Sequence, residues 1–244
     1  MFDKLPVSSK TEKILTKSLD EEISVEEANY LMNIKGADFY PLMATADYLR
    51  NQITGDDVTF INNCNINFTN ICTVRCRFCA FGKDADDPDA YILDDEAILA
   101  KARGAVDNGA HEFTLMGGVH PDADVEYYEH LLHLLKGEFP NVMIHGFSPT
   151  MINDAAIASG IDMAEACDRL KSAGLDTLPG TAAEILTDRA REIVCPEKVS
   201  VSEWIDAVRT AHEAGIPGSA TIMYGHVETL EERVEHIDII RRLQ

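Results

Sequence analysis

Residues 64–79 read CNINFTNICTVRCRFC, a run of alternating apolar residues followed at once by the cysteines Cys72, Cys76 and Cys79. The run 64–69 has the length and the period of a β-strand. The cysteines then follow on a tight loop with the spacing C-x3-C-x2-C, and three thiolates on one loop can bind three irons of a cubane iron–sulfur cluster. The fourth iron is left without a protein thiolate, so it is open to a substrate or a cofactor.

A structural zinc site and unligated cysteines are the alternatives for this triplet. Zinc generally takes four nitrogen or sulfur ligands from paired C-x2-C motifs. The sequence has no second pair, although His111 or His120 could complete a tetrahedron. The remaining cysteines, Cys64, Cys167 and Cys195, are isolated, and we expect them to be small buried hydrophobes.

From residue 58 onward, short apolar runs alternate with amphipathic helical segments, which predicts strand–helix units on a parallel sheet. We expect five units, whereas a closed (β/α)8 barrel needs eight. The sequence therefore predicts an α/β fold, a TIM-type barrel that is truncated after about five strand–helix units. The expected strands are residues 64–69, 112–116, 142–147, 175–178 and 219–224, and the expected helices are 95–108, 163–173, 201–214 and 229–243.

Residues 1–57 precede these units, and we expect them to form an N-terminal helical extension. Ser24, with Glu27 three residues later, is a capping box that predicts a helix start, and a second short helix is expected at 40–52. No chemistry-bearing motif is visible in this part. The expected domains are thus the helical extension and a core of residues 58–244.

The charge of the chain excludes one class of function. Its 244 residues include 21 Lys and Arg against 42 Asp and Glu, a formal net charge of −21. Such a surface repels nucleic acid, whose phosphates bind clustered basic residues. The acidic excess indicates either a surface for a basic partner or the composition of a salt-adapted proteome, such as that of a halophilic archaeon. Since no signal peptide and no long apolar run is visible, no membrane partner is expected and the expected location is cytoplasmic.

The other candidate residues follow the expected strands, at the face where barrel enzymes carry their sites. A glycine pair, Gly117 and Gly118, follows the second strand, and glycine allows a ligand to approach the backbone closely. His145 and His226 are alternatively core histidines, and Glu184 could instead lie in the first turn of the next helix, where it would favour the helix dipole. The candidates after the third, fourth and fifth strands are His145, Ser148, Glu184, Tyr224 and His226.

Together these motifs resemble those of the radical S-adenosylmethionine (SAM) enzymes. The resemblance implies that the cysteine triplet binds a [4Fe–4S] cluster, and that the amino and carboxylate groups of SAM chelate its open iron. It also implies that one-electron reduction yields a 5′-deoxyadenosyl radical, which abstracts hydrogen from the substrate. Gly117 and Gly118 would then meet the amino end of SAM.

Three more cofactor contacts are implied only by this resemblance. Phe78 matches an aromatic position near the adenine, although packing would also explain it. Glu184 matches a carboxylate near the ribose or the amino end. Arg191 stands where the family has an arginine, which would pair with the cofactor carboxylate; a surface ion pair is the alternative.

Within the family, residues 67–244 are similar to a subgroup of deazaflavin-forming tyrosine transferases and two menaquinone-pathway families, the aminofutalosine synthases and the cyclic dehypoxanthinyl futalosine synthases. The turn 179–185, PGTAAEI, is similar to that of the deazaflavin enzymes, where the menaquinone enzymes have PGGGAEI. The run 145–149, HGFSP, agrees with this choice. Met116 before the glycine pair departs from it, because aminofutalosine synthases share that residue.

The resemblance therefore implies a radical SAM transferase that cleaves the Cα–Cβ bond of L-tyrosine. It would couple the 4-hydroxybenzyl group to 5-amino-6-(D-ribitylamino)uracil, in the synthesis of the deazaflavin chromophore (Fo) of coenzyme F-420. His145, Ser148, Tyr224 and His226 are the expected catalytic residues. The implied partners are a companion deazaflavin-forming radical SAM subunit and an electron donor such as ferredoxin or flavodoxin. The alternatives are a menaquinone futalosine-pathway enzyme and, from another class, a non-catalytic metal-binding interaction module.

Overall fold

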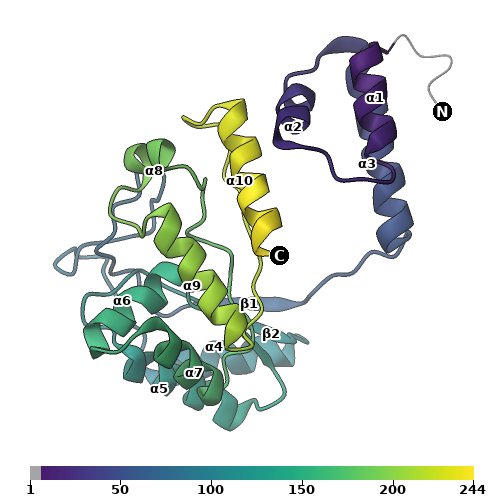
Figure 1. Ribbon diagram of the computed structural model, residues 1–244. Helices are drawn as coiled ribbons and strands as arrows, with labels where there is room; N and C mark the ends of the chain where they lie inside the picture. The colour runs from purple at the N-terminus through teal and green to yellow at the C-terminus, as the bar shows by residue number, and fades with distance from the viewer. Residues whose placement is uncertain (1–6) are drawn as a thin grey trace. The chain divides into compact units, whose positions relative to one another are not determined.

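Residues 7–244 are described by the structure, a computed structural model that Figure 1 shows as a ribbon. The chain divides into two compact units. Unit 1 holds the residues up to Phe60 together with Glu228–Arg242, and unit 2 holds Ile61–Val227. The helix expected at 229–243 is thus part of unit 1. The domain boundary expected after residue 57 stays a prediction.

Unit 1 is helical, and two of its helices begin at capping boxes. The Ser24 hydroxyl accepts a hydrogen bond from the N–H of Glu27 at 3.2 Å, and the Glu27 carboxylate accepts one from the N–H of Ser24 at 2.7 Å. Thr229 and Glu232 form a second such box. The helices of unit 1 are α1 (Ser9–Lys17), α2 (Val25–Met32), α3 (Phe39–Thr54) and α10 (Leu230–Leu243), with the short 3-10 helix η1 (Gly36–Asp38).

Unit 2 contains a parallel three-stranded sheet with the order β1-β2-β3. Its helices pack beside one another in chain order, since α5 contacts α6 and α7, and α7 contacts α9 (Figure 1). The strands are β1 (Asn63–Asn67), β2 (Glu112–Met116) and β3 (Met143–Gly146); the helices are α4 (Asp95–Asp107), α5 (Val125–Glu138), α6 (Pro149–Ser159), α7 (Met163–Ala173), α8 (Asp188–Val194) and α9 (Val201–Glu213).

The strands expected at 175–178 and 219–224 are wrong as strands. Two isolated parallel bridges, His145 to Thr177 and Leu178 to Gly218, continue the direction of the sheet. The first does not grow into a ladder, because Pro179, at the next donor position toward β3, has no N–H. The second stops because the N–H of Gly180 donates to Oγ of Ser219 at 3.0 Å and to no backbone carbonyl. The described part of unit 2 is therefore a partial barrel wall of three strands, followed by two extended segments that pair only at single positions.

The two faces of the sheet differ sharply in polarity. Ile66, Phe113, Leu115 and Ile144 are at most 1% exposed and form the apolar face. Burial of such side chains contributes about 1.5–3 kcal/mol each and fixes the strand register, because a one-residue slip would turn them to the other face. The opposite face carries polar residues at matched register positions.

None of the helices in residues 7–244 combines the length and the apolar composition that a membrane span requires.

Candidate cluster and cofactor site

The loop after β1 carries the cysteine triplet and is held by backbone hydrogen bonds from two directions. The N–H of Thr73 donates to the carbonyl of Val119 at 2.9 Å, and the N–H of Arg77 donates to the carbonyl of Val194 at 2.8 Å. The N–H of Val119 also donates to Sγ of Cys72 at 3.3 Å. The loop is thereby fixed against the segment that follows β2 and against the end of α8.

The three cysteines open into one cavity of about 120 Å³. Cys72 and Cys76 are half-buried and Cys79 is exposed. The glycine pair after β2 lines the same cavity. Phe78, Ser148 and Lys198 also line the cavity.

The glycine pair is required by a close approach of two backbones. A Cβ at Gly117 would lie 3.0 Å from the ring of Phe68, and a Cβ at Gly118 would overlap the carbonyl group of Ile71 and lie 2.8 Å from the Cβ of Cys72. No larger residue fits there without moving the cysteine loop. The sequence motif thus has a steric explanation in the packing of the two loops.

The donor set suits a cluster better than a single ion. In residues 7–244, no three side chains of His, Cys, Asp or Glu are placed to hold one metal ion. A cubane does not need such a convergence, because each thiolate binds an iron of its own. Neither His111 nor His120 lines the cavity, so the zinc alternative has no support.

Glu184 and Lys198 form an ion pair beside the cysteines, and each side chain is only 13% exposed. Nζ of Lys198 also lies 5.6 Å from the centroid of the Phe78 ring, within the range of a cation–π contact. Burial alone would lower the pKa of Lys198, but the charges of Glu184 and Cys76 outweigh it and raise the pKa. Burial raises the pKa of the Cys76 thiol to about 11.

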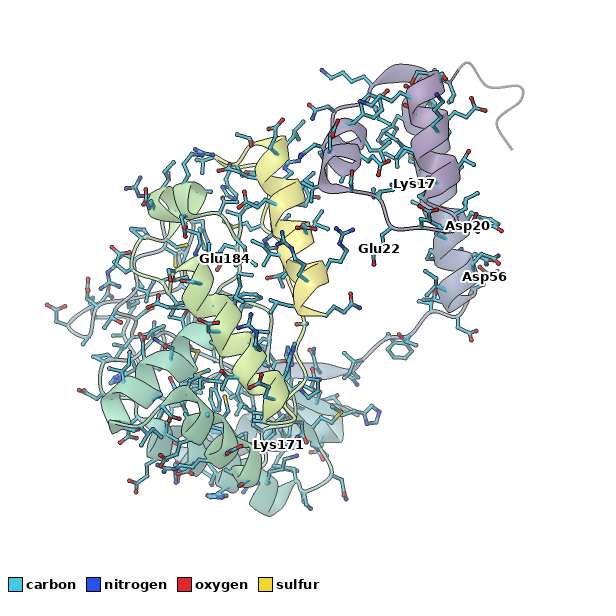
Figure 2. All side chains as sticks on the ribbon, viewed as in Figure 1. Lys17, Asp20, Glu22, Asp56, Lys171 and Glu184 are labelled. Atoms are coloured by element: carbon cyan, nitrogen blue, oxygen red, sulfur yellow. The ribbon has the colours of Figure 1, made fainter. Side chains whose placement is uncertain are left out.

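Figure 2 labels Glu184, which lies on the loop before α8. The alternative placement of Glu184 in the first turn of a helix is wrong, because α8 begins at Asp188. Glu184 has φ +45° and Ala182 has φ +68°, in the left-handed region that costs a non-glycine residue energy. Strained residues persist only where their surroundings hold them.

Arg191 supplies that support. It is 4% exposed, and its Nη1 donates to the carbonyls of Ala182 and Ala183 at 2.8 Å each. Its Nη2 donates to the carbonyl of Val199, the residue after Lys198. The alternative of a surface ion pair for Arg191 is wrong. Arg191 does not line the cysteine cavity, and a contact with a cofactor stays a prediction.

The predicted catalytic residues lie at three places. Ser148 lines the cysteine cavity and caps α6 by accepting from the N–H of Met151 at 3.3 Å. His145 is half-buried on the polar face of the sheet, outside that cavity. Tyr224, 67% exposed, and His226 lie on the loop after the fifth expected strand, outside the cavity as well.

His145 stands in a row of polar residues across the sheet. The register pairs Asn65 with Thr114 and Thr114 with His145, and Thr177 bridges to His145. Nδ1 of His145 lies 2.7 Å from Oγ1 of Thr177. Burial lowers the pKa of His145, and the charge of Glu112 opposes this only in part.

Lys198 was not among the site residues expected from the sequence. Its signal was present in the run 195–198, CPEK, next to the isolated Cys195. A lysine in a loop carries no spacing that separates it from surface lysines. Only the fold brings it to the cysteines.

A family comparison agrees with this geometry: residues 66–240 match the model of the Radical SAM superfamily. The chain belongs to the radical SAM superfamily. As a radical SAM protein it uses a [4Fe–4S] cluster and SAM, and the residues present fit both groups. Three thiols line one cavity, and the glycine pair lines it beside them.

Curated relatives of this radical SAM chain carry the name 5-amino-6-(D-ribitylamino)uracil–L-tyrosine 4-hydroxyphenyl transferase. The protein of Methanothermobacter thermautotrophicus is 48% identical over 238 residues, which cover 98% of this chain and 65% of that protein. The protein of a Nostoc species is 41% identical, over 93% of this chain and 59% of that protein. The chain thus spans less than two thirds of the length of these relatives.

Solved radical SAM structures share the fold. Methylornithine synthase superposes with a TM-score of 0.71 at 17% identity, over 96% of this chain and 65% of that one. The FeFe-hydrogenase maturase HydG of Carboxydothermus hydrogenoformans superposes with a TM-score of 0.75 at 20% identity, over 96% of this chain and 53% of that one. These similarities agree with the predicted TIM-type fold.

Proposed function

We propose that this radical SAM protein is a transferase that cleaves the Cα–Cβ bond of L-tyrosine and couples the 4-hydroxybenzyl group to 5-amino-6-(D-ribitylamino)uracil. The observation that carries the proposal is the 48% identity, over nearly the whole chain, to a relative named for this transfer. The turn 179–185 and the run 145–149 support the same choice. The relatives described above carry the transferase name, so the menaquinone-pathway enzymes and the non-catalytic module are not favoured.

As part of this proposal we assign residues of the cavity to the two cofactors. When bound, the reduced cluster and SAM supply a 5′-deoxyadenosyl radical for hydrogen abstraction. Cys72, Cys76 and Cys79 hold the cluster. Gly117, Gly118 and Phe78 line the cavity. The backbone of the glycine pair would meet the amino end of SAM, and the Phe78 ring would pack against the adenine.

The polar row on the sheet is the proposed substrate face. Asn65 and Thr114 offer hydrogen-bonding groups beside His145, while the apolar residues of these strands face the helices. Because its lowered pKa keeps His145 neutral at pH 7, the imidazole can accept a hydrogen bond or a proton from a substrate hydroxyl. Ser148, at the cavity wall, can donate to a ligand that reaches the cluster.

Tyr224 and His226 complete the proposed catalytic set. Their loop is tied to the cofactor loop, because the N–H of Met223 donates to the carbonyl of Glu184 at 2.7 Å. Nε2 of His226 lies 2.8 Å from the carbonyl oxygen of Met223. A movement of the Glu184 loop on cofactor binding would therefore also move Tyr224 and His226.

The finer setting is part of the proposal. A deazaflavin product implies the chromophore Fo of coenzyme F-420, a companion deazaflavin-forming radical SAM subunit that closes the ring, and a ferredoxin or flavodoxin as electron donor. A cytoplasmic location suits oxygen-sensitive iron–sulfur chemistry. The net charge of −21 is consistent with a halophilic archaeal host.

The test is anaerobic reconstitution of the chain with iron and sulfide, followed by dithionite, SAM, tyrosine and the ribityl-uracil. We expect 5′-deoxyadenosine and a coupled product of tyrosine and uracil. The Cys76→Ala variant should give neither, whereas Cys64→Ala, which removes a thiol outside the cavity, should give both. Turnover of a chorismate-derived futalosine precursor, with no coupled product from tyrosine, would reject the assignment.

A further inference from the structure

The helix α6 begins at the wall of the cysteine cavity. Ser148, its N-cap, and Thr150, in its first turn, both line that cavity together with the cysteines. The Ser148 hydroxyl accepts a hydrogen bond from the N–H of Met151 and can still donate its own hydrogen. The free N–H groups at the start of a helix carry a partial positive charge, so they favour an anion that can reach them.

The backbone N–H of Thr150 is the donor that this first turn leaves over. Pro149 has no N–H. The N–H of Met151 donates to the Ser148 hydroxyl, and the N–H of Ile152 donates to the Ser148 carbonyl at 3.1 Å. In the part of the chain that the structure describes, the N–H of Thr150 has no acceptor. The described residues that line the cavity include no Asp or Glu, which would repel an anion from this end of the helix.

The side chain of Thr150 is a second, independent observation. Thr150 is 1% exposed, and its hydroxyl has no hydrogen-bond partner among residues 7–244. A buried hydroxyl of this kind costs folding free energy, and a valine of the same shape would avoid that cost. Threonine populates two side-chain rotamers in helices, so a rotation about its Cα–Cβ bond can turn the hydroxyl toward the cavity. The packing of the protein gives no reason for a hydroxyl at this position, whereas a ligand in the cavity would.

A carboxylate suits these donors. The N–H of Thr150 and the hydroxyls of Thr150 and Ser148 are three donors, and a carboxylate has two oxygens that each accept more than one hydrogen bond. Hydrogen bonds to an ionised acceptor are also stronger than bonds to a neutral one. Two residues separate the end of β3 from the start of α6, and β3 carries His145 of the proposed substrate face. A substrate that lies along this face therefore reaches the start of α6 with the end that is nearer the cluster.

We propose that Thr150 and Ser148 bind the α-carboxylate of the substrate amino acid at the start of α6. The inference rests on the proposed function, since it takes L-tyrosine as the substrate. It assigns the amino-acid end of tyrosine to the cysteine cavity and its phenol to the polar row around His145. SAM also carries a carboxylate into this cavity, and the experiment separates the two sources.

The experiment measures binding to the reconstituted chain with SAM present and without a reductant, so that no turnover occurs. Equilibrium dialysis compares L-tyrosine with tyramine, which lacks the carboxylate. Thr150→Val should weaken tyrosine binding about 10- to 100-fold, the range for a hydrogen bond to a charged group. It should leave the binding of tyramine and of SAM unchanged. Thr150→Ser keeps the hydroxyl and should retain most of the affinity for tyrosine.

The stability of the chain without tyrosine gives a second measurement. Because Thr150→Val removes a buried hydroxyl that has no partner, it should raise the urea midpoint. Thr45→Val is the matched control, since Thr45 is 2% exposed on α3, outside the cavity, and its hydroxyl also has no partner among the described residues. The control should raise the midpoint as well, and it should leave tyrosine binding unchanged.

An unchanged affinity of Thr150→Val for tyrosine, or an equal loss for tyrosine and tyramine, would overturn the inference and leave the proposed function standing. A loss of SAM binding with tyrosine binding spared would overturn it too, because the subsite would then belong to the cofactor. A lower urea midpoint for Thr150→Val would do the same, since the hydroxyl would then have a structural role. If the wild type binds no L-tyrosine, the proposed function and the inference both fail.

Discussion

A Cβ added to Gly118 would lie 2.8 Å from the Cβ of Cys72, the first cysteine of the triplet. The same atom would overlap the carbonyl group of Ile71, which is backbone and cannot rotate away. The loop after β2 and the cysteine loop after β1 therefore share a contact that only glycine permits. The position of the cysteine loop thus depends on this backbone packing.

Gly118→Ala should push the cysteine loop outward and reduce the iron bound after reconstitution. The expected cost in unfolding free energy is about 1–3 kcal/mol, as for other overpacked sites. Iron and sulfide analysis with circular dichroism checks both effects. Gly104→Ala, in the middle of α4 with nothing within 4 Å of the added atom, is the control and should retain iron and gain stability. Full iron content in the Gly118 variant would contradict the packing argument.

Arg191→Met should destabilise unit 2, because it leaves the carbonyls of Ala182, Ala183 and Val199 without a buried donor. A buried acceptor that loses its partner costs about 1–3 kcal/mol, so we expect a loss of at least about 3 kcal/mol. Urea unfolding measures the change. Arg209→Met removes an exposed guanidinium and should shift the midpoint little. If the urea midpoint of Arg191→Met shifts as little as that of the control, these hydrogen bonds do not contribute measurably to stability.

His145 should make stability fall as the solution becomes more acidic. Burial lowers its pKa below the ordinary 6.5, so the unfolded chain binds the proton more readily than the folded chain. The free energy of unfolding then decreases as pH falls from about 6.5 to the folded-state pKa, and the loss is complete below that value. Urea unfolding across this range should show the slope, and His145→Gln should reduce it. His133→Gln, at an exposed position of α5, should not. A slope that persists unchanged in His145→Gln would assign the effect to other groups.

Ser200→Ala should lower the stability of α9 by about 1 kcal/mol, the usual cost of removing an N-cap hydroxyl. Trp204, the single tryptophan of the chain, lies on α9 and reports its unfolding by fluorescence.

The contribution of the Ser200–Glu203 capping box depends on pH. Hydrogen bonds from the backbone and hydroxyl of Ser200 lower the pKa of Glu203. The stabilisation is therefore present above the ordinary pKa of 4.5 and is lost as pH falls through the pKa of the folded state. The variant should therefore differ from the wild type most near neutral pH and least in acid. Ser9→Ala, at an exposed serine of α1, should leave the fluorescence midpoint in place.

The helices that the sequence predicted correctly are those with local start and stop signals. The helix expected at 163–173 is α7, with Asp162 as its N-cap and Gly174 as its C-cap, and the helix expected at 201–214 is α9, with Ser200 as its N-cap. The caps act within a few residues, so the information lies in the sequence itself. The helices α5, α6 and α8 were not predicted, although Asp124 and Ser148 provide N-caps for the first two.

The fourth and fifth strands were wrongly predicted, because strand pairing depends on residues that are distant in the sequence. An extended apolar segment becomes a strand only if a partner offers several consecutive backbone groups, and residues 175–178 and 219–224 meet such a partner at single positions. Pairing is a non-local property, and the pattern of one segment does not contain it. The sequence therefore predicted where the extended segments lie, but not whether they pair as β-strands.

The sequence by itself determined the cysteine loop, the glycine pair and the alternation of strands and helices, because each depends on residue types within one short stretch. Only the tertiary structure decided which charges stand beside the thiols. Arg191 is buried against three carbonyls, and Lys198 faces the cavity in its place. The physical reason is that a long basic side chain goes to whichever partners the fold brings within reach, and those partners lie on other loops of the chain.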